Sequence, residues 1–259
     1  MRILAAFCIA WFLTACSQLD QPVRISFVAT WQGEPISCET QGVSLSDLRF
    51  YVSNVQLVDS DGVARDVRYA TEMDWQNDAV GFIDLEDGTG SCQNGTPVIV
   101  DHLLVVAPAA DYRGLRFTVG VPFRLNHANP LTAKPPLDDQ DMHWHWRSGY
   151  KFLRAGISQA DDGFWIHAGS AGCEGTVGHI TGCSFPNRIE VDLADFVPDQ
   201  HTVVVDMSAL VAGTAMNDGQ RSDCSSGPPE TSCVAPFAAL GIDFKTGEQS
   251  GSQSVFSLR

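Results

Sequence analysis

The 259-residue sequence lacks the short motifs that mark most metalloenzymes and cytochromes. No Cys-x-x-Cys pair occurs, which argues against a structural zinc site. No Cys-x-x-Cys-His occurs either, so we expect no covalently attached haem in this chain. A His-Glu-x-x-His helix, a nucleophile elbow and a phosphate loop are also missing. We therefore expect a protein that is not an enzyme and has no catalytic residues.

Long apolar runs are equally scarce. One follows Arg2, covers residues 3–13 and leads into Leu-Thr-Ala-Cys at residues 13–16. Such a short run is typical of a secretory signal rather than a membrane span. Its end resembles a bacterial lipobox, which implies cleavage before Cys16 and lipid attachment to that residue. The alternative is an ordinary cleaved signal that leaves Cys16 free.

This pattern predicts a signal peptide over residues 1–15 and a lipid anchor with a short linker over residues 16–24. A single domain is expected over residues 25–259. Because Ser17 follows the cysteine, the usual sorting rule implies a periplasmic protein held at the outer membrane.

Basic residues are few. Lys and Arg number 16 against 31 Asp and Glu, and removal of the signal takes away Arg2 and no acid. The mature net charge is then 15 − 31 = −16, which argues against nucleic acid as a partner because phosphates would be repelled. The acidity favours solubility and attraction to cations or basic surfaces.

Six cysteines remain after Cys8 and Cys16 are set aside. An even number in an exported protein predicts disulfides, and six cysteines allow fifteen pairings. The local pairs Cys173–Cys183 and Cys224–Cys233 are favoured, and they leave Cys38 to pair with Cys92.

Long helical patterns are also missing, and short period-two runs rich in β-branched and aromatic residues recur instead. They predict an all-β, antiparallel β-sandwich with long irregular loops, stapled by disulfides. A proline-rich loop is expected over residues 126–141, and "MSALVAG" could form a helical turn. The expected strands include "VRISFVATWQG", "LRFYVSNVQLVDSDGVARDV" and "YKFLRAGISQADDGFWIHAGS".

The stretch "DMHWHWRSGYKF" at residues 141–152 is the most unusual one. If it is extended, Met142, Trp144 and Trp146 share one face, and the opposite face carries His143 and His145. Two tryptophans and a methionine on one face are usually core, with exposed histidines behind them.

Two further histidines favour a metal site over that structural reading. His127 lies upstream, and His167 lies on the next expected strand, which a hairpin would bring close. Imidazoles with sulfur and aromatic neighbours suit copper better than magnesium or calcium, although zinc remains an alternative. No motif supports His102, His179 or His201.

Several stretches together resemble the MbnP family of periplasmic copper-binding proteins, which occurs beside methanobactin genes and in the wider "metallo-mystery pair" systems. The resemblance covers residues 25–256 and includes the four late cysteines. It rests on "LRFYVSNVQLVDSDG", "GFIDLEDGTGSCQNGT", "GLRFTVGVPFRLNHANP", "PPLDDQDMHWHWRSGYKFLRAG", "IHAGSAGC" and "FAALGIDF".

The resemblance implies a partner and a modification. Family members pair with a dihaem cytochrome c peroxidase-like enzyme, MbnH, which oxidises a tryptophan to kynurenine. Ring opening makes an aryl amine that, unlike indole nitrogen, can bind copper as Cu(I) or Cu(II). His127 and His167 would be the histidine ligands, and Trp144 is favoured over Trp146 as the modified residue. Candidate extra ligands are Met142, His143, His145 and Trp165. Of these, His143 and His145 are expected to be exposed.

Copper uptake or handling is therefore the expected function. The alternative from another class is a surface β-sandwich lipoprotein for adhesion or carbohydrate binding, with no metal. In that case the tryptophans would stack on sugars.

Overall fold

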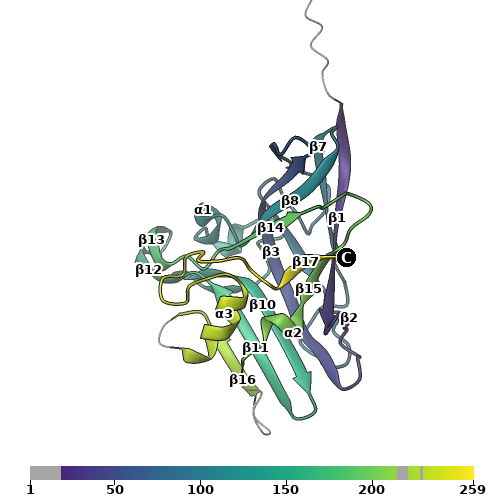
Figure 1. Ribbon diagram of the computed structural model, residues 1–259. Helices are drawn as coiled ribbons and strands as arrows, with labels where there is room; N and C mark the ends of the chain where they lie inside the picture. The colour runs from purple at the N-terminus through teal and green to yellow at the C-terminus, as the bar shows by residue number, and fades with distance from the viewer. Residues whose placement is uncertain (1–18, 215–220, 228–229) are drawn as a thin grey trace, which may run out of the picture.

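Two β-sheets packed face to face form the body of the protein (Figure 1). This computed structural model describes residues 19–214, 221–227 and 230–259. The signal predicted over residues 1–15 and the anchor at Cys16 lie outside those residues. Strands make up 48% of the chain and helices 9%, so the expected all-β fold with little helix is confirmed.

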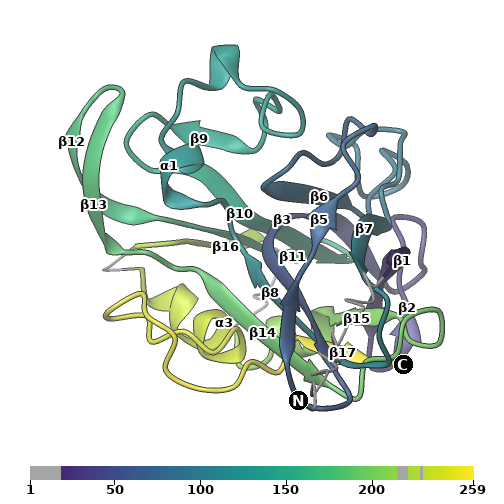
Figure 2. The same ribbon diagram turned by 90° about the horizontal axis from the view of Figure 1, so that it is seen from above.

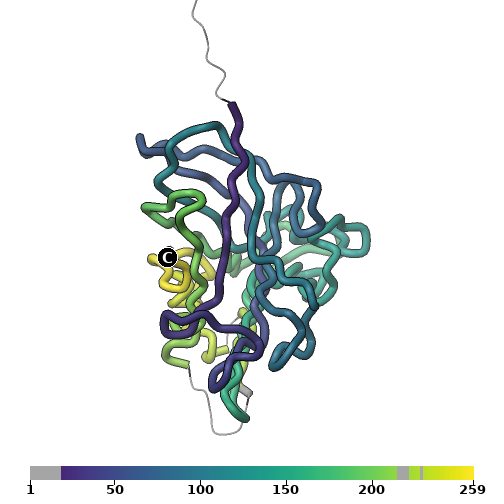
Figure 3. The backbone as a smooth tube through the Cα atoms, turned by 90° about the vertical axis from the view of Figure 1, so that its right-hand side faces the viewer, coloured from purple at the N-terminus to yellow at the C-terminus, as the bar shows by residue number. Residues whose placement is uncertain are grey.

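The first sheet has six strands, ordered β17-β15-β1-β7-β5, with β2 paired to β1. Most neighbours are antiparallel, but β1 and β15 run parallel. Figure 3 shows β1 running along much of the molecule. The strands are β1 (Asp20–Trp31), β2 (Glu34–Pro35), β5 (Arg68–Tyr69), β7 (His102–Pro108), β15 (Val203–Asp206) and β17 (Phe256–Leu258).

The second sheet has nine strands, ordered β14-β8-β3-β10-β11-β16. Three short strands lie off this path, because β4 and β6 pair with β3 and β9 pairs with β10. The strands are β3 (Val43–Asp59), β4 (Ala64–Asp66), β6 (Val80–Asp84), β8 (Tyr112–Val119), β9 (His143–His145), β10 (Gly149–Gln159), β11 (Asp162–Gly169), β14 (Ile189–Ala194) and β16 (Arg221–Ser225).

A separate hairpin of β12 (Ala171–Thr176) and β13 (His179–Phe185) projects from the sheets (Figure 2). The helices are short, and among the described residues none is long and apolar enough to cross a membrane. They are α1 (Phe123–Asn126), η1 (Pro130–Thr132), α2 (Met207–Leu210), η2 (Thr231–Cys233) and α3 (Val234–Ala239).

The main core fills the space between the two sheets. Alternating strand positions point inward, as the period-two patterns predict. Phe27 and Phe256 each meet Phe50 edge to face, with ring centroids 5.5 and 5.8 Å apart. Such pairs add about 0.5–1.5 kcal/mol each beyond the burial of their surface.

A second, smaller core lies under the segment that connects β8 to β10. Tyr51, Val121, Met142 and Tyr150 are fully buried in it. The hydroxyl groups of the two tyrosines donate to carbonyls of the connecting segment, at Pro136 O and Leu137 O. Burying a side chain such as Met142 stabilises by roughly 1.5–3 kcal/mol. The long connection is therefore fastened to the sheet and can hold side chains in place.

Three disulfides join Cys38 to Cys92, Cys173 to Cys183, and Cys224 to Cys233. These are the pairs that the sequence favoured. The second lies directly across the β12–β13 hairpin, and the third ties β16 to η2.

One expectation about strands needs correction. The Trp-rich segment does not form one long hairpin strand leading to His167. Only residues 143–145 are extended, as the separate strand β9, which folds back onto the start of β10. The structure also contains a strand that the period-two patterns did not reveal, β16, which pairs in parallel with β11.

Candidate metal centre

Trp144 and His167 lie against each other where β9 pairs with the start of β10. Their ring centroids are 6.3 Å apart in an edge-to-face arrangement. His167 comes from β11, with the core-facing Ile166 and Ala168 on either side of it. A side chain at Gly149 would meet the Asn126 carbonyl at 2.2 Å, and its φ of +79° favours glycine. This glycine therefore allows the tight return from β9 into β10.

Asn126 holds His127 beside this turn. The Asn126 side chain is fully buried, and its Oδ1 accepts from Tyr150 N at 2.8 Å. Its Nδ2 donates to Ser148 O at 3.1 Å and lies 3.3 Å from His127 Nε2. The position of the imidazole is thus coupled to the turn that carries the tryptophans.

The same imidazole has two other neighbours. Its Nε2 lies 3.5 Å from Cys183 Sγ, and its ring meets that of Phe123 edge to face with centroids 4.8 Å apart. His127 therefore lies between α1 and the β12–β13 hairpin.

Each of these two histidines has one buried ring nitrogen without a hydrogen-bond partner. Among the described residues five buried side-chain N or O atoms lack a partner, and two of them are His127 Nδ1 and His167 Nε2. Leaving a buried polar atom unpaired costs about 1–3 kcal/mol, so such atoms need an explanation. Two imidazole nitrogens of this kind are a donor set that fits a bound copper ion.

The protonation of both rings is consistent with metal binding. Burial, helped by the positive charges of Lys151 and Arg154, lowers the pKa of His167 to about 4. Burial also lowers the pKa of His127, although a hydrogen-bond interaction with the Trp146 backbone acts in the opposite direction. Both imidazoles are therefore neutral at neutral pH, which is the form that binds metals.

The tryptophan segment does not alternate cleanly between two faces. Met142 is fully buried in the second core, away from solvent. His143 is half-buried against Tyr150, with ring centroids 5.2 Å apart, so the expectation that it is exposed is wrong. His145 is exposed as expected.

Trp146 and Trp165 lie apart from the contact between Trp144 and His167. The Trp146 ring contacts His145, and the Arg147 guanidinium lies 5.0 Å from its centroid. Trp165 shares the His167 face of β11, but it packs across Gly156 and lines a pocket with several serines.

A buried charge cluster lies in the same sheet, and sequence reasoning missed it. Asp47 Oδ2 lies 2.8 Å from Arg49 Nη2 and 2.8 Å from Arg154 Nε. The contact with Arg154 is an ion pair only, because its geometry is not that of a hydrogen bond. Asp84 and Glu86 complete the cluster, which therefore has three acids and two bases. Arg154 pairs in register with His167, so the cluster lies next to the candidate site. The only signal in the sequence was polar residues within runs that otherwise predict buried strand.

The excess acid in this cluster predicts a pH-dependent stability. Burial, reinforced by the charge of Glu86, raises the pKa of Asp84 to about 8. A raised folded-state pKa gives stability that is complete below the unfolded value near 4 and is lost as the pH rises through 8. The three histidines with lowered pKa act in the opposite direction, but only below about pH 6.5.

We therefore expect the free energy of unfolding to fall by roughly 1–2 kcal/mol between pH 6.5 and 8. Asp84→Asn, which keeps a neutral group of the same shape, should remove most of this slope. Urea unfolding at several pH values measures it, and equal slopes in the two proteins would contradict the assignment.

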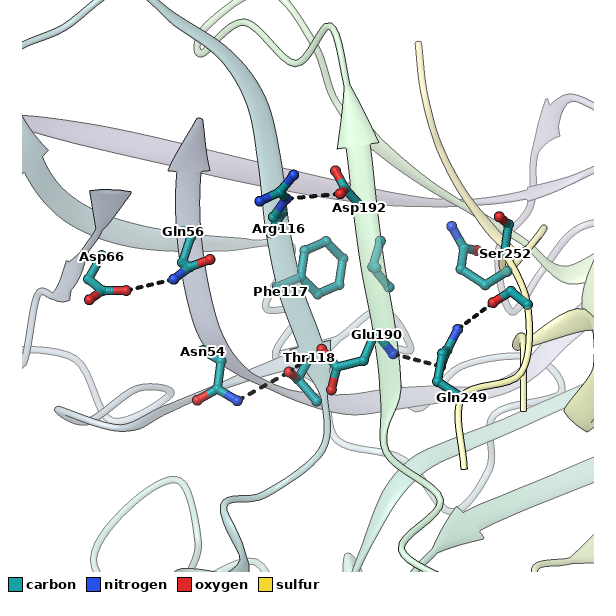
Figure 4. Close-up of a pocket in the computed structure, with 13 residues that line it drawn as sticks. Asn54, Gln56, Asp66, Arg116, Phe117, Thr118, Glu190, Asp192, Gln249 and Ser252 are labelled. Atoms are coloured by element: carbon teal, nitrogen blue, oxygen red, sulfur yellow. Dashed lines mark hydrogen bonds and ion pairs between the residues drawn. The ribbon is translucent and has the colours of Figure 1, made fainter. Parts of the chain in front are cut away.

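A large open groove lies elsewhere, on β3, β8 and β14 beside the C-terminal segment (Figure 4). It measures about 650 Å³. Its polar side chains pair with one another, as in the bonds from Asn54 to Thr118 and from Arg116 to Asp192. None of the residues that line the groove is among the five with a buried, unpartnered side-chain atom.

Comparisons with known proteins agree on one family. The family model MbnP matches residues 20–226, and MbnP from Methylosinus trichosporium is a structural match with a TM-score of 0.79. That alignment has 24% identity and covers 93% of this chain and 98% of the other. No curated protein matches the chain. The residues matched by the family model include His127, Trp144 and His167.

Proposed function

This chain belongs to the MbnP family, and from that membership we propose that it is an exported protein that binds copper through His127, His167 and an oxidised Trp144. The observation that carries the proposal is the pair of buried, unpartnered nitrogens, His127 Nδ1 and His167 Nε2, on residues that contact the tryptophan segment. The copper ion is cargo, and the role is binding for uptake or handling rather than catalysis.

Tryptophan alone is a poor third ligand because the indole nitrogen shares its lone pair with the ring. Oxidative opening of the pyrrole ring leaves an aryl amine and a ketone, and the amine nitrogen can donate to copper. We propose that a dihaem peroxidase-like partner of the MbnH type carries out this oxidation. Two imidazoles and one amine give a low coordination number that suits Cu(I).

The cellular location is part of the proposal. The lipobox-like ending before Cys16 supports lipid attachment, and Ser17 supports sorting to the outer membrane. Metabolic labelling with a fatty acid should mark the wild-type protein in its native host. Labelling that persists in Cys16→Ser would contradict the anchor.

Copper titration of protein that has been treated with the partner tests the ligands. His127→Ala and His167→Ala should each weaken copper binding at least about tenfold, since changes around metal ligands already cost that much. His179→Ala is the matched control, because its side chain is exposed and no motif supports it as a ligand. Equal affinity in the two ligand variants and the wild type would defeat the site.

A carbohydrate-binding role is the second candidate, and Trp165 is the observation that favours it. Its ring lines a pocket of about 330 Å³ together with Ser44, Ser46, Ser91 and Ser158. An aromatic face among hydroxyl groups is a composition that can bind sugars. A glycan array tests this role, and binding that is lost in Trp165→Ala would favour it over copper handling.

A further inference from the structure

We propose that Cys173, Cys183 and His127 form a second metal site, which opens when the disulfide between the two cysteines is reduced. One ligand atom from each of these residues lies within 4.8 Å of the other two. His127 would use Nε2, which is 3.5 Å from Cys183 Sγ. The proposed copper site uses the opposite ring nitrogen, and because a neutral imidazole has only one nitrogen free to donate, the two sites compete for His127.

The hairpin keeps the two sulfur atoms together after reduction. Cys173 and Cys183 occupy directly opposed positions of β12 and β13. Side chains at such positions have Cβ atoms about 4.5–5.5 Å apart. The base of the hairpin is fixed to the body, because Ser170 Oγ donates to Pro186 O and Asn187 Nδ2 donates to Gly169 O. The thiols therefore stay close to His127.

This disulfide is also the one most open to a reductant. Thiol–disulfide exchange requires an attacking thiolate to reach a sulfur atom. Cys183 is partly exposed, whereas the exposed fractions of the cysteines in the other two disulfides are between 0% and 3%. The hairpin also projects from the sheets, as Figure 2 shows. A mild dithiol should therefore reduce Cys173–Cys183 first.

The redox step balances with a dithiol as the reductant. The Cys173–Cys183 S–S bond breaks, and the dithiol closes into its own disulfide. Its two hydrogen atoms pass to the two cysteine sulfurs, so two electrons enter the protein. Metal binding then displaces two protons, because thiolates and not thiols are the ligands.

The donor set determines which metal fits. Two thiolates and one imidazole are soft ligands, and thiolates favour Cu(I) and Zn²⁺ over Mg²⁺ or Ca²⁺. Three donors from the protein match the low coordination that Cu(I) accepts. The metal class is therefore a soft, thiolate-binding ion, with Cu(I) as the probe.

Cu(I) titration against a coloured chelator tests the site on protein that has not been exposed to the proposed dihaem partner. After mild reduction, the wild type should bind one Cu(I) more than the oxidised form. Cys173→Ser/Cys183→Ser should bind no extra ion, and His127→Ala should weaken the extra site at least about tenfold. Because tryptophan is unmodified in this experiment, its outcome is independent of the proposed kynurenine site.

The Cys224–Cys233 pair is a matched control. It closes a loop of similar length, with a sequence separation of 9 against 10, and both of its cysteines are fully buried. Strong reduction of Cys224–Cys233 in the Cys173→Ser/Cys183→Ser background measures the Cu(I) affinity of a reduced cysteine pair that has no histidine beside it. Equal Cu(I) affinity in the two cases would overturn the proposal. Loss of the strand signal in circular dichroism after mild reduction would also overturn it, because the site needs the hairpin.

Discussion

Trp144→Phe is expected to abolish the mass gain that oxidation by the partner produces, and Trp146→Phe is expected to leave it intact. Kynurenine differs from tryptophan by one added oxygen and one lost carbon, a gain of about 4 Da. Trp144 is the indole that lies against His167, with 6.3 Å between ring centroids. Its ring-opened product would therefore form beside a histidine that has an unpartnered nitrogen.

Trp146 is a poorer target for electron removal. The Arg147 guanidinium lies 5.0 Å from the centre of its ring, and a nearby positive charge disfavours a second one on the indole. Intact-mass measurement after treatment with the dihaem partner and peroxide separates the two cases, with Trp165→Phe as a further control. A mass gain that persists in Trp144→Phe and disappears in Trp146→Phe would assign the modification to the other residue.

Arg49→Met should lower the free energy of unfolding by about 3–5 kcal/mol, the range seen when one partner of a buried ion pair is removed. Arg49 is 1% exposed, and it donates to Asp47 from Nε at 2.9 Å and from Nη2 at 2.8 Å. Its Nε also lies 3.9 Å from Glu86 Oε1. Methionine fills a similar volume but leaves these carboxylates with less compensating charge.

Arg116→Met is the matched control for this experiment. Arg116 pairs with Asp192 at 2.9 Å, a similar distance, but the two side chains are 47% and 62% exposed. Exposed pairs contribute about 0–1 kcal/mol, so this variant should be close to wild type in denaturant unfolding. Similar losses in the two variants would mean that burial is not what makes Arg49 important.

The sandwich was predictable because its strands alternate. In β11 the residues at 164, 166 and 168 are buried and those between them are less so, and the turn at Ala160 and Asp161 leaves one reasonable pairing with β10. The parallel contact between β11 and β16 was not predictable. Those strands are separated by more than fifty residues, and long-range pairing leaves no local pattern in the sequence.

The candidate site was predictable in its residue types but not in its geometry. The cluster of histidines and tryptophans was visible, and the family resemblance named His127 and His167. The short strand β9 could not be foreseen, because it depends on Asn126 and on the positive φ of Gly149. The half-burial of His143 and the buried ion cluster depend on packing between strands that no local pattern reveals.

The arrangement of β1 has a mechanical consequence if the chain is held at its amino terminus by the proposed lipid anchor. Asp20–Ser26 pair with β7 on one side, and Phe27–Thr30 pair with β15 on the other. Inter-strand hydrogen bonds lie roughly across the strand direction, so a pull on the chain ahead of Asp20 loads many of them at once. β1 would therefore resist tension in shear rather than unzip one bond at a time. Under the proposed lipid anchoring, β1 would therefore stay paired when the chain ahead of it is pulled.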